Sequence, residues 1–194
     1  VWLRRKADEF DAQMSLVKTF NLPISDIGRT KAQLSAKILG AVQRDHNDEF
    51  EIEFPDTLRI ERYTEVLNWY KNPLNRDYSK SLEIEVAGVP HVFAWGGLHG
   101  AIPKYFGEGW YINVDVASYY PSLMLRYGWI SRNVADPAKY DEIYHTRLKL
   151  KAEKNPMQQP YKIVLNSTYG AMKDRHNAMY DPRQANNVCV GGQL

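Results

Sequence analysis

A short apolar run that carries one carboxylate is the feature that most constrains the fold of this chain. In residues 111–122 (YINVDVASYYPS) three β-branched residues alternate with Asn113 and Asp115, and a period of two places successive side chains on opposite faces of a β-strand. Asp115 therefore points away from the apolar side chains of the predicted strand, which ends in a turn at Tyr120 and Pro121. Because aspartate is unfavourable among β-branched strand residues, we interpret Asp115 as a candidate metal ligand.

The composition is that of a soluble globular protein. The 194 residues are 44% hydrophobic and 25% charged, and no apolar run approaches the roughly 18–20 residues that a membrane span requires. The single cysteine, Cys189, excludes an internal disulfide and a thiolate metal site, which favours a reducing, cytoplasmic setting and a buried, apolar role for this side chain. A first residue Val1, without a leader sequence, predicts a segment of a longer protein.

Positive charge is concentrated in the second half of the chain. Residues 1–100 carry 13 Lys and Arg against 15 Asp and Glu, whereas residues 101–194 carry 12 against 8. The basic residues are densest between Arg147 and Lys162, where Glu153 is the single acid. Such a run is usually a solvated helix face, and the alternative is a binding surface for an anionic ligand.

The first part of the chain is predicted to be helical. Thr30 and Gln33 have the spacing of a capping box, which predicts a helix start at this point. Residues 43–55 are polar and acidic and are predicted to be a connection. Apolar residues recur at three- and four-residue steps in three segments, which predicts amphipathic helices over residues 1–20, 31–42 and 57–69.

The pattern changes to strands near residue 81. Apolar and polar residues alternate on both sides of Ala87 and Gly88, which predicts a β-hairpin over residues 81–95. Three glycines follow in residues 96–100. They predict either a turn or a place where the backbone approaches another surface closely.

The second half is predicted to form helices again. A helix over residues 120–127 follows the turn at Pro121, which suits a first helical position. Helical periodicity then runs over residues 136–154 and resumes over residues 161–169, where Gly170 is predicted to break it. Two helices joined by so short a loop pack as an antiparallel hairpin.

This predicted hairpin gathers positive charge. Arg147 and Lys151 are four residues apart on the first helix, and Lys162 and Asn166 are four apart on the second, so each pair shares a helix face. Arg binds phosphate in a bidentate manner and Lys as a point charge. If Asp115 carries a divalent metal, the two halves of a nucleoside triphosphate site are present.

Two sequence motifs in these segments resemble motifs of a known protein family. The segment DVASYYPS, which begins at Asp115, resembles the first palm motif of the B-family DNA polymerases, DxxSLYPS, and KIVLNSTYG, which begins at Lys162, resembles their fingers motif, KxxxNSxYG. Their order and separation also match, and the short interval between them resembles a phage-type enzyme. Two departures are Tyr119, where the family has Leu, and Ala94, where the family carries the Tyr of a YxGG element.

The resemblance implies phosphoryl transfer assisted by two Mg²⁺ ions. The catalytic residues would be Asp115, which would bind both ions with help from the Val116 carbonyl, and Lys162, which would donate a proton to pyrophosphate. Tyr120 would support the deoxyribose and exclude a 2′-hydroxyl. The residues implied to bind the incoming deoxynucleoside triphosphate are Ser118, Tyr119, Tyr120, Arg147, Lys151, Lys162 and Asn166. Those implied to contact a DNA primer–template are Gly96, Gly97, Tyr169 and Gly170.

The predicted fold class is α+β. It comprises an antiparallel palm sheet with packed helices, a short helical-hairpin fingers insertion and an N-terminal helical region. We expect residues 1–80 to be helical, by resemblance the end of an exonuclease domain plus a linker, residues 81–135 to be palm, 136–170 fingers, and 171–194 a return to palm. A second palm motif with further carboxylates would be expected in a missing C-terminal palm and thumb segment.

Two other functions stay open at this point. One is a non-catalytic module that binds nucleic acid through the basic half on a palm-like frame. The other is an RNA-copying palm enzyme, which Tyr120 disfavours. His99, His145 and His176 are too scattered along the sequence to suggest a metal site.

Overall fold

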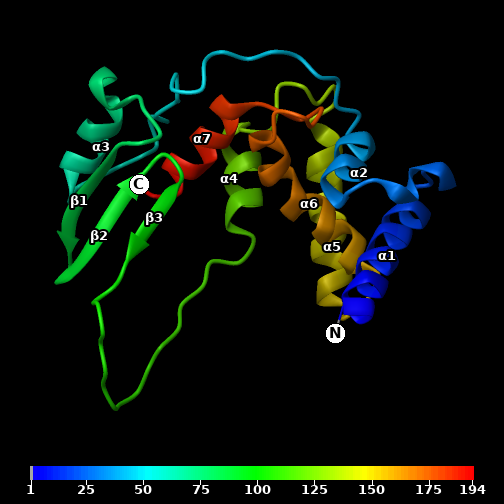
Figure 1. Ribbon diagram of the computed structural model, residues 1–194, viewed down its shortest axis with the longest axis horizontal. Helices are drawn as coiled ribbons and strands as arrows, with labels where there is room; N and C mark the ends of the chain where they lie inside the picture. The colour runs from blue at the N-terminus through cyan, green and yellow to red at the C-terminus, as the bar shows by residue number, and fades with distance from the viewer. Residues whose placement is uncertain (1) are drawn as a thin grey trace.

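The structure is a computed structural model and describes residues 2–194. Within this range the chain has an α+β fold, with a three-stranded antiparallel sheet and α-helices. In Figure 1 the sheet and helix Thr64–Lys71 form one lobe and four helices form the other, with helices Tyr119–Tyr127 and Pro182–Gly191 between the two lobes. The predicted mixed fold class is therefore confirmed. Among the described residues, no helix combines the length and apolar character needed to cross a membrane.

The helices and strands are bounded as follows. The helices are α1 (Trp2–Thr19), α2 (Lys31–Ile38), α3 (Thr64–Lys71), α4 (Tyr119–Tyr127), α5 (Ala138–Ala152), α6 (Gln158–Lys173) and α7 (Pro182–Gly191). Two short 3₁₀ helices are η1 (Ile24–Gly28) and η2 (Pro73–Asn75), and the strands are β1 (Ser81–Val86), β2 (Val89–Ala94) and β3 (Gly97–Gly100).

The predicted capping box starts α2. The backbone amide of Gln33 donates to Thr30 Oγ1 over 3.2 Å, and the backbone amide of Thr30 donates to Gln33 Oε1 over 3.0 Å. These two bonds satisfy donors that a helix start leaves free. The helix ends at Ile38, earlier than predicted, because Gly40 takes a left-handed conformation with φ of 65°.

The predicted helical hairpin is formed by α5 and α6, which lie side by side in Figure 1. The buried Tyr140 hydroxyl near the start of α5 donates to the Leu165 carbonyl in the middle of α6 over 3.3 Å. The prediction that Gly170 ends the second helix is wrong, because α6 continues to Lys173. A glycine costs a helix about 1 kcal/mol, and the buried residues Ala171 and Met172 directly after it offset that cost.

The predicted β-hairpin is confirmed, with β1 antiparallel to β2. The turn residues Ala87 and Gly88 both have positive φ, 51° and 79°, as the turns that match strand twist require. The following glycine segment extends the sheet, since β3 pairs with β2. Gly100 meets the ring of His91 across this pair, where an added Cβ would lie 2.2 Å from ring atoms.

Two predicted elements are wrong. Residues 111–116 form no strand and lie in an extended loop between β3 and α4, with Ile112 89% and Val114 84% exposed. A lone apolar run gains little as a strand without a neighbour to pair and pack with. The helix predicted from residue 57 starts only at Thr64, because Tyr63 adopts a left-handed φ of 57° and its hydroxyl accepts a hydrogen bond from the Ala87 amide.

Two hydrophobic clusters stabilise the lobes, and α7 contributes to both. Leu165 and Val188 belong to the cluster of the helical lobe, whereas Trp95 and Val190 belong to the cluster under the sheet. The cysteine on α7, Cys189, is buried as predicted. The sequence did not predict α7 itself, whose polar appearance hides its buried position.

A charged network links the loop before α3 to the start of α7. The Arg132 guanidinium donates to both carboxylate oxygens of Asp48, over 2.7 and 2.8 Å, and to both of Asp181, over 2.7 and 3.0 Å. Asp181 is fully buried and also caps α7 through the Gln184 amide. These hydrogen bonds with Arg132 hold the pKa of Asp48 at about 2.

Candidate nucleotide site

The two motif segments meet where α4, α5 and α6 pack together. Ser118 precedes α4 with a left-handed φ of 54°, and its hydroxyl accepts a hydrogen bond from Arg147 Nη1 over 2.9 Å. Arg147 lies on α5 and is 9% exposed, and its Nε is buried with no hydrogen-bond partner among the described residues. A buried guanidinium without a carboxylate is costly, so this geometry would suit an anionic ligand.

An aromatic contact joins α4 to α6. The rings of Tyr120 and Tyr169, one from each motif, lie 4.6 Å apart between centroids. Burial is the main cause that raises the pKa of both hydroxyls, with Cys189 as a further cause. Both side chains are therefore neutral at physiological pH and present apolar ring surface with a polar tip.

Lys173 was not predicted as a site residue, although it lies four residues after Tyr169 on the same helix face. Its Nζ donates to the Tyr169 hydroxyl over 3.3 Å and lies 5.4 Å from the centre of that ring. The i, i+4 spacing from a motif residue was the sequence signal that could have identified it.

Lys162 and Asn166 on α6 share an open cavity of about 290 Å³, to which Lys31 at the start of α2 also contributes. No carboxylate pairs with Lys162 or with Lys151 anywhere in the described range. The rest of the cavity wall comes from Gln159, Ile163 and Ser167. A cationic, hydrogen-bonding hollow of this kind suits phosphate oxygens.

The side chain of Tyr119 forms a hydrogen bond within the protein. Its hydroxyl donates to the Gly192 carbonyl over 2.6 Å. The resemblance to B-family polymerases implies that the backbone amides of Ser118, Tyr119 and Tyr120 contact the triphosphate, and this contact stays a prediction.

Two of the predicted DNA-binding glycines, Gly96 and Gly170, have no packing reason to be glycine, whereas Gly97 has a φ of 152° that favours glycine. A Cβ added to Gly96 or to Gly170 would meet nothing within 4 Å, and Gly170 lies inside α6, where glycine is unfavourable. Gly97 begins β3 at the edge of the sheet. The DNA contact implied for Gly96, Gly97 and Gly170 stays a prediction.

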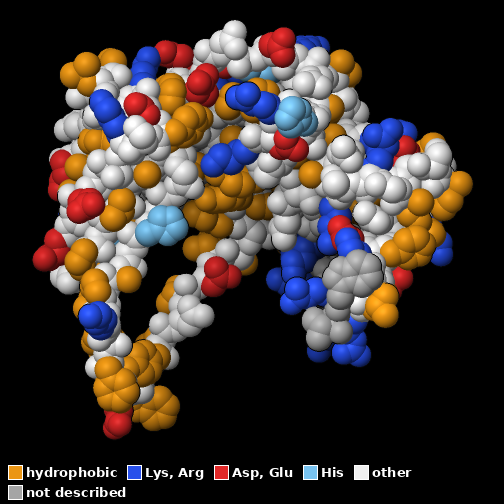
Figure 2. Space-filling view, in the orientation of Figure 1, with side chains coloured by type: hydrophobic (Ala, Val, Ile, Leu, Met, Phe, Trp, Pro, Cys, Tyr) orange, Lys and Arg blue, Asp and Glu red, His pale blue; other side chains and the backbone are white. Residues whose placement is uncertain are grey.

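Asp115 lies apart from these groups, in the exposed loop. Its side chain forms no hydrogen bond or ion pair with another described residue. Figure 2 shows this loop as an arm across an open gap from the helical lobe, where Lys and Arg side chains gather. The basic helices and the loop with the carboxylate thus face a common space.

The donor set around Asp115 is too small for two magnesium ions. Mg²⁺ prefers oxygen ligands, one or two carboxylates with waters and phosphates, and Asp115 with the Val116 carbonyl could contribute to one ion. Within residues 2–194, no three His, Cys, Asp or Glu side chains are grouped closely enough to hold a metal. The residues present therefore do not fit a complete two-ion centre.

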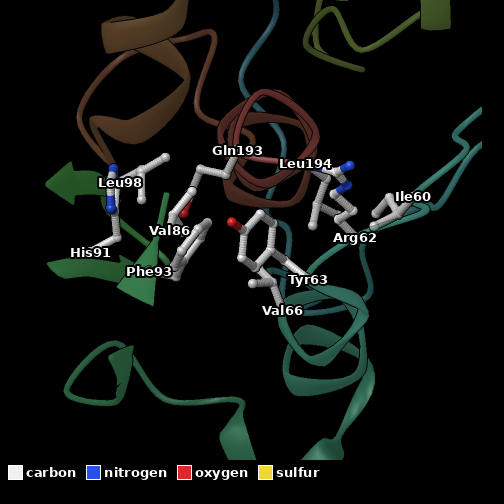
Figure 3. A pocket seen from close by; sticks show the side chains of 10 residues that line it. All are labelled: Ile60, Arg62, Tyr63, Val66, Val86, His91, Phe93, Leu98, Gln193 and Leu194. Carbon is white, nitrogen blue, oxygen red and sulfur yellow. The ribbon is translucent and has the colours of Figure 1, made fainter. Parts of the chain in front are cut away.

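A separate apolar pocket of about 180 Å³ lies in the other lobe (Figure 3). Phe93 from the sheet and Tyr63 and Val66 near α3 form its walls, and Gln193 and Leu194 cover one side. None of the residues predicted for nucleotide or DNA binding lines it. The predicted nucleotide-binding residues on α5 and α6 therefore lie outside this pocket.

Comparison with known proteins gives one partial match. The chain is 52% identical over 33 residues to the DNA polymerase of Acidianus bottle-shaped virus (isolate Italy/Pozzuoli), a stretch that covers 17% of this chain and 5% of that protein. No family model matches the chain. No solved structure matches it either. Over that stretch the chain is similar to a viral DNA polymerase.

Proposed function

We propose that this chain is the palm-and-fingers part of a family B DNA-directed DNA polymerase, which binds a deoxynucleoside triphosphate and a primer–template. The observation that carries this proposal is the contact between Tyr120 of the first motif and Tyr169 of the second. Arg147, which lies on α5 between the two motifs in sequence, also donates to Ser118 of the first motif. The partial match to a viral DNA polymerase supports the same assignment.

In this proposal the basic side chains of the helical hairpin bind the triphosphate. Arg147, Lys151 and Lys162 would neutralise its charge, and Asn166 would contact the nucleotide beside them. Tyr120 would pack against the deoxyribose and exclude a 2′-hydroxyl. Arg147 is buried on α5, so its guanidinium would need little reorganisation when the nucleotide binds, whereas Lys151, Lys162 and Asn166 are exposed.

Magnesium is proposed as the cofactor. When bound, it would stabilise the phosphate charge and the attacking hydroxyl. Asp115 and the Val116 carbonyl are the proposed ligands from this chain, and further carboxylates would have to come from outside residues 2–194. We place the activity in the cytoplasm, that of an infected host cell if the protein is viral.

Nucleotide binding by the purified chain tests this proposal. Lys162→Ala is expected to weaken the binding of a fluorescent deoxynucleoside triphosphate by about 10- to 100-fold, the scale of one hydrogen bond to a charged group. Titration at constant magnesium and salt measures the dissociation constant. Lys139→Ala, which removes an exposed cation from α5, is the matched control and is expected to bind normally. Equal affinities for both variants would remove the nucleotide site.

A non-catalytic nucleic-acid-binding module is the second candidate function. The observation that favours it is that Asp115 belongs to no group of three or more His, Cys, Asp or Glu side chains within residues 2–194. Salt-dependent DNA binding without nucleotide affinity would support this function over the polymerase.

A further inference from the structure

Another cavity, of about 220 Å³, is lined in part by Lys173, the residue that contacts Tyr169. Its wall contains two cations, Lys173 and Arg175, and two aromatic side chains, Tyr78 and Tyr180. Pro182, Ala185 and Asn186 complete the lining. No acidic side chain lines this cavity, so its charge is positive.

The two cations are available to a ligand. Neither Lys173 nor Arg175 forms an ion pair with a carboxylate in the part of the chain that the structure describes. Both are exposed. Phosphate is the anion that a Lys and an Arg at the rim of an aromatic hollow suit best.

A buried amide fixes the wall of this cavity. Asn186 is fully buried, and its Nδ2 donates to the Glu49 carbonyl over 2.8 Å and to the Tyr78 hydroxyl over 3.0 Å. Because a backbone carbonyl only accepts, the amide nitrogen must face Glu49, and the Tyr78 hydroxyl accepts and keeps its own proton free to donate. Asn186 Oδ1 is left buried without a partner among the described residues, a cost that functional sites accept.

A further cavity adjoins the one lined by Lys173 and Arg175. Arg175 and Tyr180 also line an adjoining cavity of about 390 Å³, together with Asp45, His46 and Asn47. A single nucleotide needs only one hollow, whereas a strand needs a continuous path. The carboxylate of Asp45 disfavours phosphate in the adjoining cavity, so the phosphate contact is assigned to the Lys173 and Arg175 side.

We propose that this cavity binds an unpaired nucleotide of a single DNA strand, with the base against the Tyr78 and Tyr180 rings and its phosphate on Lys173 and Arg175. Aromatic stacking combined with cations is the way in which proteins hold single strands. The proposal rests on the proposed function, because Lys173 also contacts Tyr169 and so places the unpaired nucleotide next to the nucleotide site.

Binding of two labelled strands to the purified chain, without magnesium or nucleotide, tests this proposal. One strand is a dodecamer of deoxycytidine, and the other has the same length and phosphates but abasic residues. Fluorescence anisotropy at several salt concentrations gives both affinities. We expect the cytidine strand to bind about 5- to 100-fold more tightly, the range for stacking of one base.

Variants of Tyr180 and Arg175, which line both cavities, separate the base contact from the phosphate contact. Tyr180→Leu is expected to reduce the cytidine strand to the affinity of the abasic strand, whereas Tyr180→Phe retains the ring and the difference. Arg175→Ala is expected to weaken both strands equally and to lower the slope of log affinity against log salt by about 1. Lys139→Ala, an exposed cation on α5, should leave that slope unchanged.

The outcomes are distinguishable from failure of the polymerase assignment. If Tyr180→Leu keeps the preference for bases, or if Arg175→Ala behaves as Lys139→Ala, the cavity proposal is wrong, whatever Lys162→Ala does to nucleotide binding. If Lys162→Ala leaves nucleotide affinity unchanged while Tyr180 and Arg175 control strand binding, the polymerase assignment fails and the strand site remains. Circular dichroism confirms that each variant is folded, and Tyr180→Phe and Arg175→Ala keep the test valid if Tyr180→Leu unfolds.

Discussion

The cationic helical hairpin and the loop that carries Asp115 differ in how the fold holds them. Arg147 and Tyr169 lie on packed helices, and each contacts a residue of the first motif. Asp115 lies in an extended segment whose neighbours Ile112 and Val114 are 89% and 84% exposed. Packing within the described residues therefore positions Arg147 and Tyr169, whereas no hydrogen bond or ion pair from a described residue positions the Asp115 carboxylate.

The largest expected effect on stability comes from truncating a buried side chain of the helical hairpin. Leu165→Ala on α6 removes a side chain that is 1% exposed, and the cavity should cost about 2–5 kcal/mol of unfolding free energy. Urea unfolding followed by circular dichroism measures it. Ile112→Ala in the loop is the matched variant and should change stability by less than about 0.5 kcal/mol. A comparable loss at Ile112 would show that the loop is packed.

A smaller effect is expected from acid, through the network at Arg132. Hydrogen bonds from Arg132 hold the pKa of Asp48 at about 2 in the folded protein, against 3.8 for a free Asp. A depressed pKa contributes stability above the unfolded value, and that contribution is lost as the pH falls from about 4 through about 2. Because the side chain of Asp48 is 30% exposed, about 1–2 kcal/mol is expected after solvent screening.

Unfolding free energies across this pH window test the acid effect. Asp48→Asn should flatten the pH dependence below pH 4. Asp56→Asn, which changes an exposed carboxylate outside the network, should leave it as in the unmodified protein. An identical acid profile for all three proteins would exclude Asp48 as the titrating group.

The smallest expected effect concerns Gly170 and has opposite signs for stability and binding. Gly170→Ala should raise the unfolding free energy by about 0.5–1 kcal/mol, because the site is inside α6 and open to a Cβ. If the glycine is needed for DNA, the more stable variant should bind a primer–template more weakly in an anisotropy titration. Unchanged DNA binding would remove Gly170 from the site.

Local chemistry made part of the fold predictable. The capping box at Thr30, the turn at Ala87 and Gly88, and the antiparallel helical hairpin depend on residues close in sequence. Such interactions are encoded in neighbouring side chains and need no distant partner. The motif residues were also recognisable because their types and spacing are specific.

Elements that depend on distant contacts were predicted wrongly or not at all. The strand expected at residues 111–116 needs a pairing partner, which the described residues do not supply. The helix expected from residue 57 is delayed by the contact of Tyr63 with the Ala87 amide. The polar helix α7 is buried because Asn186 and Asn187 have partners far away in sequence, in residues 49–78. The cavity proposed to bind a DNA strand depends on one of these long-range contacts, because Asn186 and Tyr78 both line it.

The position of α7 has a mechanical consequence for the whole molecule. Val188 packs in the cluster of the helical lobe and Val190 in the cluster under the sheet, only two residues along the same helix. Unfolding of either lobe would remove packing contacts from the other lobe. The two lobes are therefore expected to unfold in a single cooperative step. A nucleic acid bound to one lobe would therefore contact a structure that is stabilised by the packing of both lobes.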